Sequence, residues 1–154
     1  MKWTPQDIEM YAKSKEYVDT VVISLFPVSF GQEMKQSASM SEFLTLLTNQ
    51  LERLFTGRIL TLPPFTYLKN GNNEQWLPLL KQWEKKLQEE EVKHIVYLTS
   101  DSDWKMNEAE LEGTLIWMPS LPLETMDDSQ KFTLVQSQVK QLQQLVTQKW
   151  QENE

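Results

Sequence analysis

Cysteine is absent from the 154 residues of this chain, and histidine occurs only once, at position 94. Without cysteine the chain forms no disulfide bond, no thiolate metal site and no cysteine nucleophile. A single histidine also excludes a metal centre that is built on several histidines. We therefore predict neither a metal site nor a cofactor.

Long apolar runs are also missing. No segment approaches the roughly 18 uncharged apolar residues that a membrane-spanning helix needs. The first residues, Met1-Lys2-Trp3-Thr4-Pro5, lack the apolar core of a signal peptide. The expectation is a cytoplasmic protein without a membrane span.

Positive charge is in deficit. The 15 Lys and Arg residues are outnumbered by 22 Asp and Glu residues, so the net charge is −7, and the basic residues are scattered along the chain. A phosphate backbone would be repelled by such a protein. We therefore expect no nucleic acid among its partners.

Large apolar side chains are plentiful. Hydrophobic residues make up 40% of the chain, and six Trp, six Phe and four Tyr residues are among them. This composition differs from that of disordered proteins, and the length suits one folded unit with its own core. We predict a single domain over residues 1–154.

Four segments carry the signals of helices. Thr4 followed by Pro5 is a hydroxyl cap before a proline in the first turn. Ser39 and Glu42 have the spacing of a capping box, which predicts that a second helix starts there. Apolar residues at spacings of three and four predict two more helices, at 76–87 and at about 129–152.

Four apolar runs between these helices have the character of strands, at 18–26, 58–62, 92–99 and 113–118. Prolines at 27, 63 and 119 follow three of them. Strands that alternate with helices require crossover connections and hence parallel pairing. The predicted fold class is α/β: a single-domain, doubly wound, mostly parallel four-stranded sheet with helices on both faces.

Ligands of such sheets bind beyond the carboxyl ends of the strands. This rule selects the four loops at 28–39, 63–73, 100–104 and 119–125. Their polar residues are the ligand-binding candidates: Ser29, Gln32, Glu33, Tyr67, Asp101, Asp103 and Ser120.

The first of these loops contains one glycine, Gly31. A dinucleotide fingerprint needs three glycines, and a phosphate-binding P-loop needs a Gly-Lys-Ser or Gly-Lys-Thr ending, so neither motif is present. The helix that follows could still bind an anion with the help of Ser37 and Ser39. Helix capping alone is the other explanation of these two serines.

Two interpretations stay open for Asp101 and Asp103. Carboxylates at this spacing can share a hard cation such as Mg²⁺. Asp-Ser-Asp is equally the composition of a turn that caps a short helix.

His94 also has two interpretations. It is either a general base or a packed or edge residue of its strand. The C-terminal helix packs on the sheet or forms a homodimer contact.

Four motifs are distributed over the first half of the chain: MKW at 1–3, KEYVDT at 15–20, PVSFG at 27–31 and LPPFTY at 62–67. With these motifs the chain as a whole resembles the YpiF-like family of small uncharacterised bacterial proteins. This family is a domain of unknown function, so it implies no catalytic residues.

A second, fainter similarity links VVISLFPVSFGQE at 21–33 and GRILTLPPFTY at 57–67 to the first strands of creatininase-type amidohydrolases. Only Gln32 and Glu33 match part of the metal loop of those enzymes, and the histidines of that loop are absent. The similarity implies a shared fold that has lost its metals.

Two functional hypotheses follow. The first is a non-catalytic binding or regulatory domain that holds a protein partner or a small ligand at the carboxyl edge of its sheet. The second is a small hydrolase or transferase that uses loop carboxylates, such as a degenerate creatininase-like enzyme. No catalytic residue is assigned.

Overall fold

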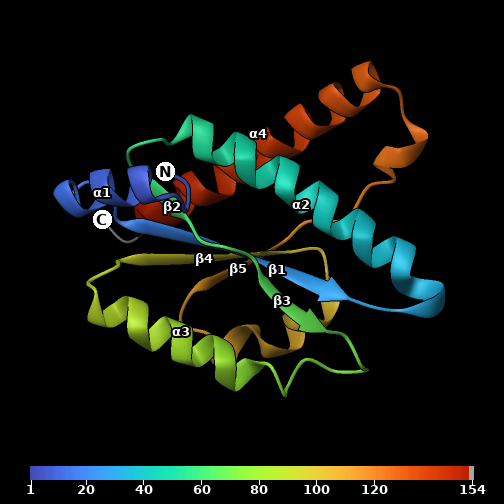
Figure 1. Cartoon of the computed structure of the whole chain (residues 1–154), viewed down its shortest axis with the longest axis horizontal. Coiled ribbons are helices and arrows are strands. Elements are labelled where there is room, and N and C mark those ends of the chain that lie inside the picture. The colour runs from blue at the N-terminus through green and yellow to red at the C-terminus, as the bar shows by residue number, and fades with distance from the viewer. Residues whose placement is uncertain (153–154) are drawn as a thin grey trace.

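The computed structural model describes residues 1–152. Its helices are α1 (Pro5–Lys13), α2 (Met34–Leu54), α3 (Leu77–Glu89) and α4 (Asp128–Glu152), and its strands are β1 (Thr20–Val28), β2 (Ile59–Thr61), β3 (Phe65–Leu68), β4 (His94–Thr99) and β5 (Thr114–Trp117). Three 3-10 helices, η1 (Gly31–Glu33), η2 (Ser102–Glu110) and η3 (Leu123–Thr125), follow strands at the same edge of the sheet (Figure 1).

The five strands form one sheet in which every strand pair is parallel. The order is β2-β1-β4-β5, and β3 continues the line of β2 by pairing with the second half of β1. Helices α2 and α4 lie on one face and α3 on the other (Figure 1). The prediction of an α/β fold with a mostly parallel sheet is confirmed.

The fifth strand was not expected, because Phe65–Leu68 falls in the segment 63–73 that the sequence predicts to be a loop. Two prolines, Pro63 and Pro64, interrupt the apolar run. Proline lacks an N–H group and usually ends a strand or stays at a sheet edge. Here the chain passes the prolines and resumes pairing along the same neighbour, β1.

Strand β1 runs past its predicted end and includes Pro27. Its pairing with β4 stops at Ser24, whereas its pairing with β3 covers Leu25–Val28. Beyond Ser24 the strand therefore has a ladder partner on one side only, and a residue without an N–H group is tolerated there.

The predicted start of the second helix is wrong. Helix α2 begins at Met34, so Ser39 and Glu42 lie inside the helix rather than at its cap. Gly31 has a φ of +78°, which allows the tight turn of η1 to lead straight into α2. The hydroxyl of Ser37, in the first turn, donates to the carbonyl of Met34. The capping box is therefore only a coincidence of spacing.

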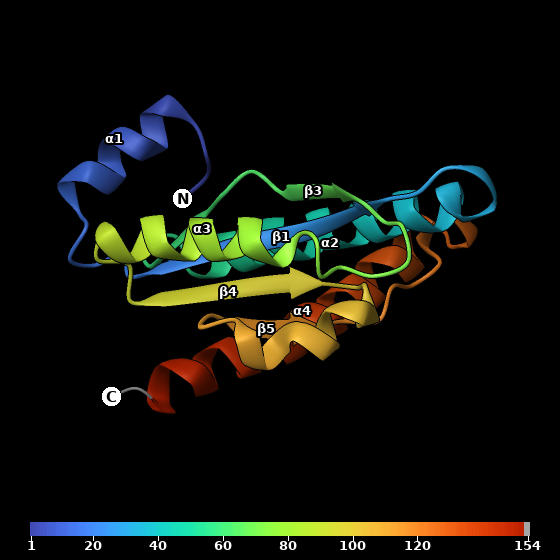
Figure 2. The ribbon, with the colours of Figure 1, turned by 90° about the horizontal axis from the view of Figure 1, so that it is seen from below.

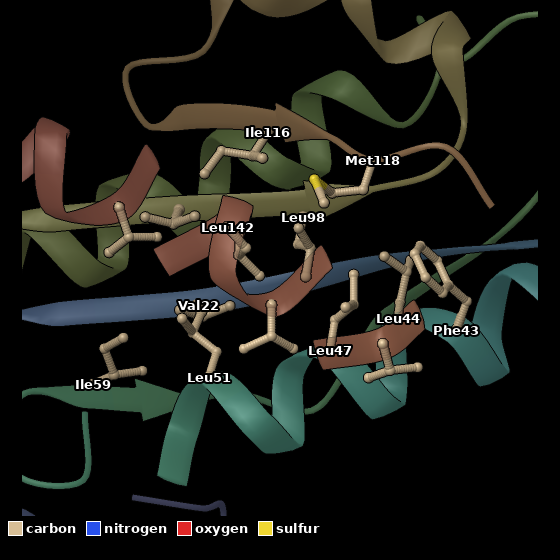
Figure 3. Packing of buried hydrophobic residues seen from close by; sticks show 14 of the residues in the cluster. Val22, Phe43, Leu44, Leu47, Leu51, Ile59, Leu98, Ile116, Met118 and Leu142 are labelled. Atoms are coloured by element: carbon tan, nitrogen blue, oxygen red, sulfur yellow. The ribbon is translucent and has the colours of Figure 1, made fainter. Parts of the chain in front are cut away.

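Each face of the sheet carries its own apolar cluster. Figure 3 shows the cluster between the sheet and helices α2 and α4, where Leu47 and Leu51 of α2 approach Leu142 of α4. The other cluster joins the sheet to α3 and η2 through residues such as Leu80, Tyr97 and Trp104. Because both faces are covered, the strands are apolar on both sides, as expected for a parallel sheet.

Helix α1 is packed differently from the other helices. None of its nine residues is buried, and only Ile8 and Tyr11 pack partly against the core. Its start is as predicted, since the hydroxyl of Thr4 accepts a hydrogen bond from the N–H of Asp7.

None of the helices within residues 1–152 combines the length and the apolar character that a membrane crossing requires.

Candidate functional site

The order of the strands determines where the sheet can bind a ligand. From β1 the chain first builds β2 and β3 on one side and then crosses to β4 on the other side. The carboxyl ends of β1 and β4 therefore border the topological switch point, where the loops diverge and leave a crevice.

A cleft of about 390 Å³ lies at this point, and we call it the switch-point cleft. The loop after β1 supplies Ser29, and η1 supplies Glu33. The first turn of α2 supplies Ser37, and the loop after β4 supplies Ser100 and Asp101. Ser120, which follows β5, closes the cleft. Segments that are far apart in the sequence thus contribute to one hollow.

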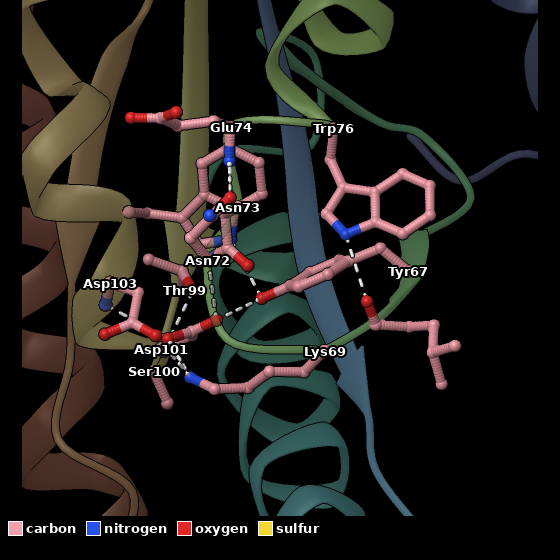
Figure 4. Close-up of polar contacts among 12 residues, drawn as sticks. Tyr67, Lys69, Asn72, Asn73, Glu74, Trp76, Thr99, Ser100, Asp101 and Asp103 are labelled. Carbon is pink, nitrogen blue, oxygen red and sulfur yellow. Dashed lines mark hydrogen bonds and ion pairs between the residues drawn. The ribbon is translucent and has the colours of Figure 1, made fainter.

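Asp101 is the most deeply buried charged residue of the cleft, with an exposed fraction of 1%. One carboxylate oxygen accepts hydrogen bonds from the Tyr67 hydroxyl at 2.6 Å and the Asn73 amide at 2.9 Å. The other accepts from the Lys69 ammonium at 2.6 Å and from the N–H of Asp103 at 3.0 Å. Figure 4 shows these four donors converging on Asp101.

Burial by itself raises the pKa of Asp101, but the hydrogen bonds from Lys69, Tyr67 and Asn73 outweigh burial and hold this pKa below its usual value. Lys69 shows the converse balance. Burial lowers its pKa, and the hydrogen bonds to Asp101 and Asp103 raise the pKa above its usual value. The pair is therefore ionised near neutral pH.

Tyr67 is held by the same residues. Burial, together with the hydrogen bond to the Asp101 carboxylate, raises the pKa of its phenol well above the usual value. The oxygen of Tyr67 also accepts a hydrogen bond of 2.8 Å from the indole of Trp104. Tyr67 therefore stays protonated and acts as a link between Trp104 and Asp101.

The two interpretations of Asp101 and Asp103 can now be separated. Asp101 caps η2 by accepting from the N–H of Asp103, so the turn-and-cap interpretation is confirmed. The ammonium of Lys69 lies 2.6 Å from Asp101 and 3.0 Å from Asp103, where a shared metal cation would have to sit. Within residues 1–152, no group of three or more acidic or histidine side chains is arranged to hold a metal ion.

The buried hydroxyl of Ser100 has no hydrogen-bond partner in the described chain, and the same holds for the amide oxygen of Asn73. The carbonyl of Ser100 accepts from the indole of Trp117 at 3.2 Å, so the backbone of Ser100 is held while the hydroxyl is not. Buried hydroxyls are rarely left without a partner. A ligand group or a water molecule in the cleft would supply one.

Four of the seven predicted site residues line the switch-point cleft: Ser29, Glu33, Asp101 and Ser120. Tyr67 and Asp103 adjoin it through their bonds to Asp101 and Lys69. Gln32 is exposed in η1 and does not line the cleft. Most of the candidates are thus brought together, but around a buried carboxylate that is already hydrogen bonded.

Sequence reasoning missed Lys69, Asn73, Ser100 and Trp104. A signal existed for Lys69, which directly follows the strand Phe65–Leu68. Had the alternation of FTYL been interpreted as a strand, Lys69 would have been placed at the carboxyl edge. Trp104 and Asn73 carry no such signal, because their roles depend on contacts with Tyr67 and Asp101.

His94 lies outside this site. The sequence places it inside its strand, whereas it is the first residue of β4 and pairs in register with Thr20, the first residue of β1. It therefore lies where the strands begin, at the opposite end of the sheet from the switch-point cleft. Of the predicted interpretations, the position at the end of its strand is observed.

The comparisons with known proteins agree on one family. The family model described as "Protein of unknown function (DUF2487)" matches residues 9–150. The chain is 35% identical over 150 residues to "Uncharacterized protein YpiF" of Bacillus subtilis (strain 168), which covers 97% of this chain and 98% of the relative. No solved structure matches.

The similarity to creatininase-type amidohydrolases stays a prediction. The YpiF-like resemblance, in contrast, is confirmed over almost the whole length of the chain. The chain belongs to the DUF2487 family of proteins of unknown function.

Proposed function

We propose that this protein is a non-catalytic binding domain that holds a small, uncharged polar ligand in the switch-point cleft. The observation that carries the proposal is the buried Ser100 hydroxyl, which lines the cleft and has no partner among the described residues. A ligand with hydroxyl or amide groups would complete it.

The chemistry of the lining supports an uncharged ligand. Five serines line the cleft: Ser29, Ser37, Ser100, Ser102 and Ser120. A hydroxyl both donates and accepts, so it suits neutral polar groups. The positive charge of Lys69 is already balanced by Asp101 and Asp103, whereas Glu33 adds negative charge. An anionic ligand would therefore meet no spare positive charge.

The size of the cleft fits the same class. A volume of about 390 Å³ lies at the lower end of the range of roughly 300–1,000 Å³ for small-molecule sites. The apolar side chains of Pro27, Met40 and Trp117 give part of the lining a non-polar surface. A monosaccharide or a nucleoside offers both a polar edge and a less polar face.

Catalysis by Asp101 is disfavoured by its contacts. Both of its oxygens already accept hydrogen bonds, and its pKa lies below the usual value, so it is a poor proton acceptor. The hydrolase or transferase alternative then depends on Glu33, the other carboxylate of the cleft.

The binding proposal is tested by NMR titration of the full chain with ribose, glucose, inositol and adenosine, and with the phosphate esters of the same compounds. We expect saturable shifts of the Ser29, Ser100 and Ser120 amides with at least one neutral compound. Ser100→Ala should weaken that binding by about two- to tenfold, which corresponds to one hydrogen bond. The matched control is Ser129→Ala, on the exposed start of α4.

Preferential binding of the phosphate esters, or an unchanged affinity in Ser100→Ala, would contradict the proposal. Hydrolysis of p-nitrophenyl acetate or phosphate that is lost in Glu33→Gln but kept in Glu42→Gln would establish the enzymatic alternative instead.

A further inference from the structure

A second hollow, larger than the switch-point cleft, lies between α1 and α3 on the face of the sheet that α3 covers. It has a volume of about 830 Å³, and we call it the α1–α3 groove. Its apolar lining includes Trp3, Tyr11, Val21, Leu60, Leu62 and Trp83. Figure 2 shows α1 standing apart from α3, with the start of the chain between them.

Helix α1 bridges this groove without filling it. On one side, the carbonyl of Met1 accepts hydrogen bonds from the N–H of Thr61 at 2.9 Å and from its hydroxyl at 3.1 Å, which ties the segment before α1 to β2. On the other side, Val18 is buried in the core. Between these anchors no residue of α1 is buried, and Trp3 keeps 56% of its surface exposed.

The apolar lining of the groove indicates that the buried part of a ligand is apolar. Two indole rings, a phenol ring and aliphatic side chains from β1 and β2 surround the groove. Sites of this kind take apolar molecules, because apolar surface removed from water is the main source of affinity. The volume lies within the usual range for small ligands.

The charged residues at the groove indicate the charge of the ligand's polar group. Lys86 pairs with Glu89 at 3.5 Å, and Glu90 pairs with Lys15 at 3.6 Å. Among the charged residues that line the groove in the described part of the chain, Lys85 alone has no ion-pair partner. One positive charge is therefore left at the rim of an apolar groove.

We propose that the α1–α3 groove binds one molecule of a monomeric, single-chain anionic amphiphile such as a fatty acid. The alkyl tail lies against Trp3, Leu62 and Trp83, and the carboxylate lies at Lys85. This site is independent of the switch-point cleft, which is lined by other residues.

The first test is calorimetry of the full chain with octanoate, decanoate and dodecanoate below their micelle concentrations. We expect one site per chain and an affinity that rises up to about fourfold for each added methylene group, because each buried methylene contributes about 0.8 kcal/mol. At equal tail length, decanoate should bind more tightly than decanol, and decanol more tightly than decyltrimethylammonium.

The second test uses exposed residues, so that folding is preserved. Lys85→Glu should weaken decanoate binding by about two- to fivefold, the range of an exposed ion pair, and should strengthen decyltrimethylammonium binding. Lys81→Glu is the matched control, because Lys81 is an exposed lysine of α3 that does not line the groove. Trp3→Ala should weaken the binding of all three compounds, whereas Phe132→Ala on α4 should weaken the binding of none.

Equal affinity for the three compounds would contradict the proposed preference for an anionic head group. An equal response of decanoate binding to Lys85→Glu and Lys81→Glu would contradict it as well. Binding to anionic lipid vesicles but not to monomeric decanoate would overturn the proposal in favour of a membrane surface. A concentration-dependent dimer that loses its contact in Trp3→Ala and binds no decanoate would show that a second copy fills the groove.

Discussion

At the scale of single residues, Tyr67 holds two buried polar groups in place. Its hydroxyl donates to Asp101 at 2.6 Å and accepts from the indole N–H of Trp104 at 2.8 Å, and Trp104 is fully buried. Tyr67 and Asp101 were both selected from the sequence as polar residues of the carboxyl edge. Their bond to each other was not predicted, because 34 residues separate them.

Replacing Tyr67 by phenylalanine should reduce the free energy of unfolding by about 1.5–3 kcal/mol, because the Trp104 indole N–H and one Asp101 oxygen each lose a buried partner. Urea unfolding followed by tryptophan fluorescence measures this change. Tyr17→Phe, at a tyrosine that is 69% exposed, is the control and should change stability by less than about 0.5 kcal/mol. An equal effect of the two substitutions would show that the Tyr67 hydroxyl contributes nothing.

At the scale of elements, α4 is fixed to the sheet at its last turn. The indole N–H of Trp150 donates to the hydroxyl of Thr20 at 2.8 Å, Arg58 lies 3.7 Å from the centre of the ring, and Phe55 packs edge-on at 4.8 Å. The helix was predicted at about 129–152 and is found at 128–152. Of the two predicted roles, packing is observed: Val139 and Leu142 belong to the core cluster shared with α2.

Trp150→Ala should lower the free energy of unfolding by about 3–5 kcal/mol, since a buried indole is removed and the hydroxyl of Thr20 loses its donor. Thermal or urea unfolding, with circular dichroism as the readout, measures the loss. Trp3→Ala is the matched control, because Trp3 is mostly exposed and should cost less than about 1 kcal/mol. A small loss in Trp150→Ala would mean that α4 is held by its other contacts alone.

At the scale of the whole molecule, Asp101 and Lys69 connect the loops after β3 and β4, so their titration should appear in overall stability. Because the folded-state pKa of Asp101 is depressed, its contribution is complete above the unfolded value of about 3.9 and is lost as pH falls through the lower folded value. Because the pKa of Lys69 is raised, its contribution is complete below about 10.4 and is lost as pH rises through the higher folded value.

We therefore expect the stability difference between the native protein and Asp101→Asn to stay constant from about pH 5 to pH 9 and to shrink below about pH 4. Urea unfolding at a series of pH values measures it. Lys69→Met, at a partly exposed lysine, provides the same comparison at the alkaline end and replaces Asp101→Asn if that variant does not fold. A difference that grows on acidification would contradict the depressed pKa of Asp101.

Elements whose ends depend on neighbouring residues could be predicted from the sequence, whereas elements that depend on distant partners could not. The end of β2 before Pro63 and the start of α1 at Thr4 depend on neighbouring residues, so both were found from the sequence. The start of α2 was misplaced, because the capping box at Ser39 and Glu42 is also compatible with a helix interior. Strand β3 was missed, because Pro63 and Pro64 interrupt the apolar run and an alternation of only four residues does not predict a strand without its partner β1.

The sequence by itself determined the α/β class and the parallel pairing, since apolar runs, prolines and helix periodicity act over a few residues. Only the tertiary structure decided which loops meet. Asp101 bonds to Tyr67, Lys69 and Asn73, which lie 34, 32 and 28 residues away, and these bonds depend on the order β2-β1-β4-β5. Local patterns carry no information on strand order, because that order is selected by packing over the whole sheet.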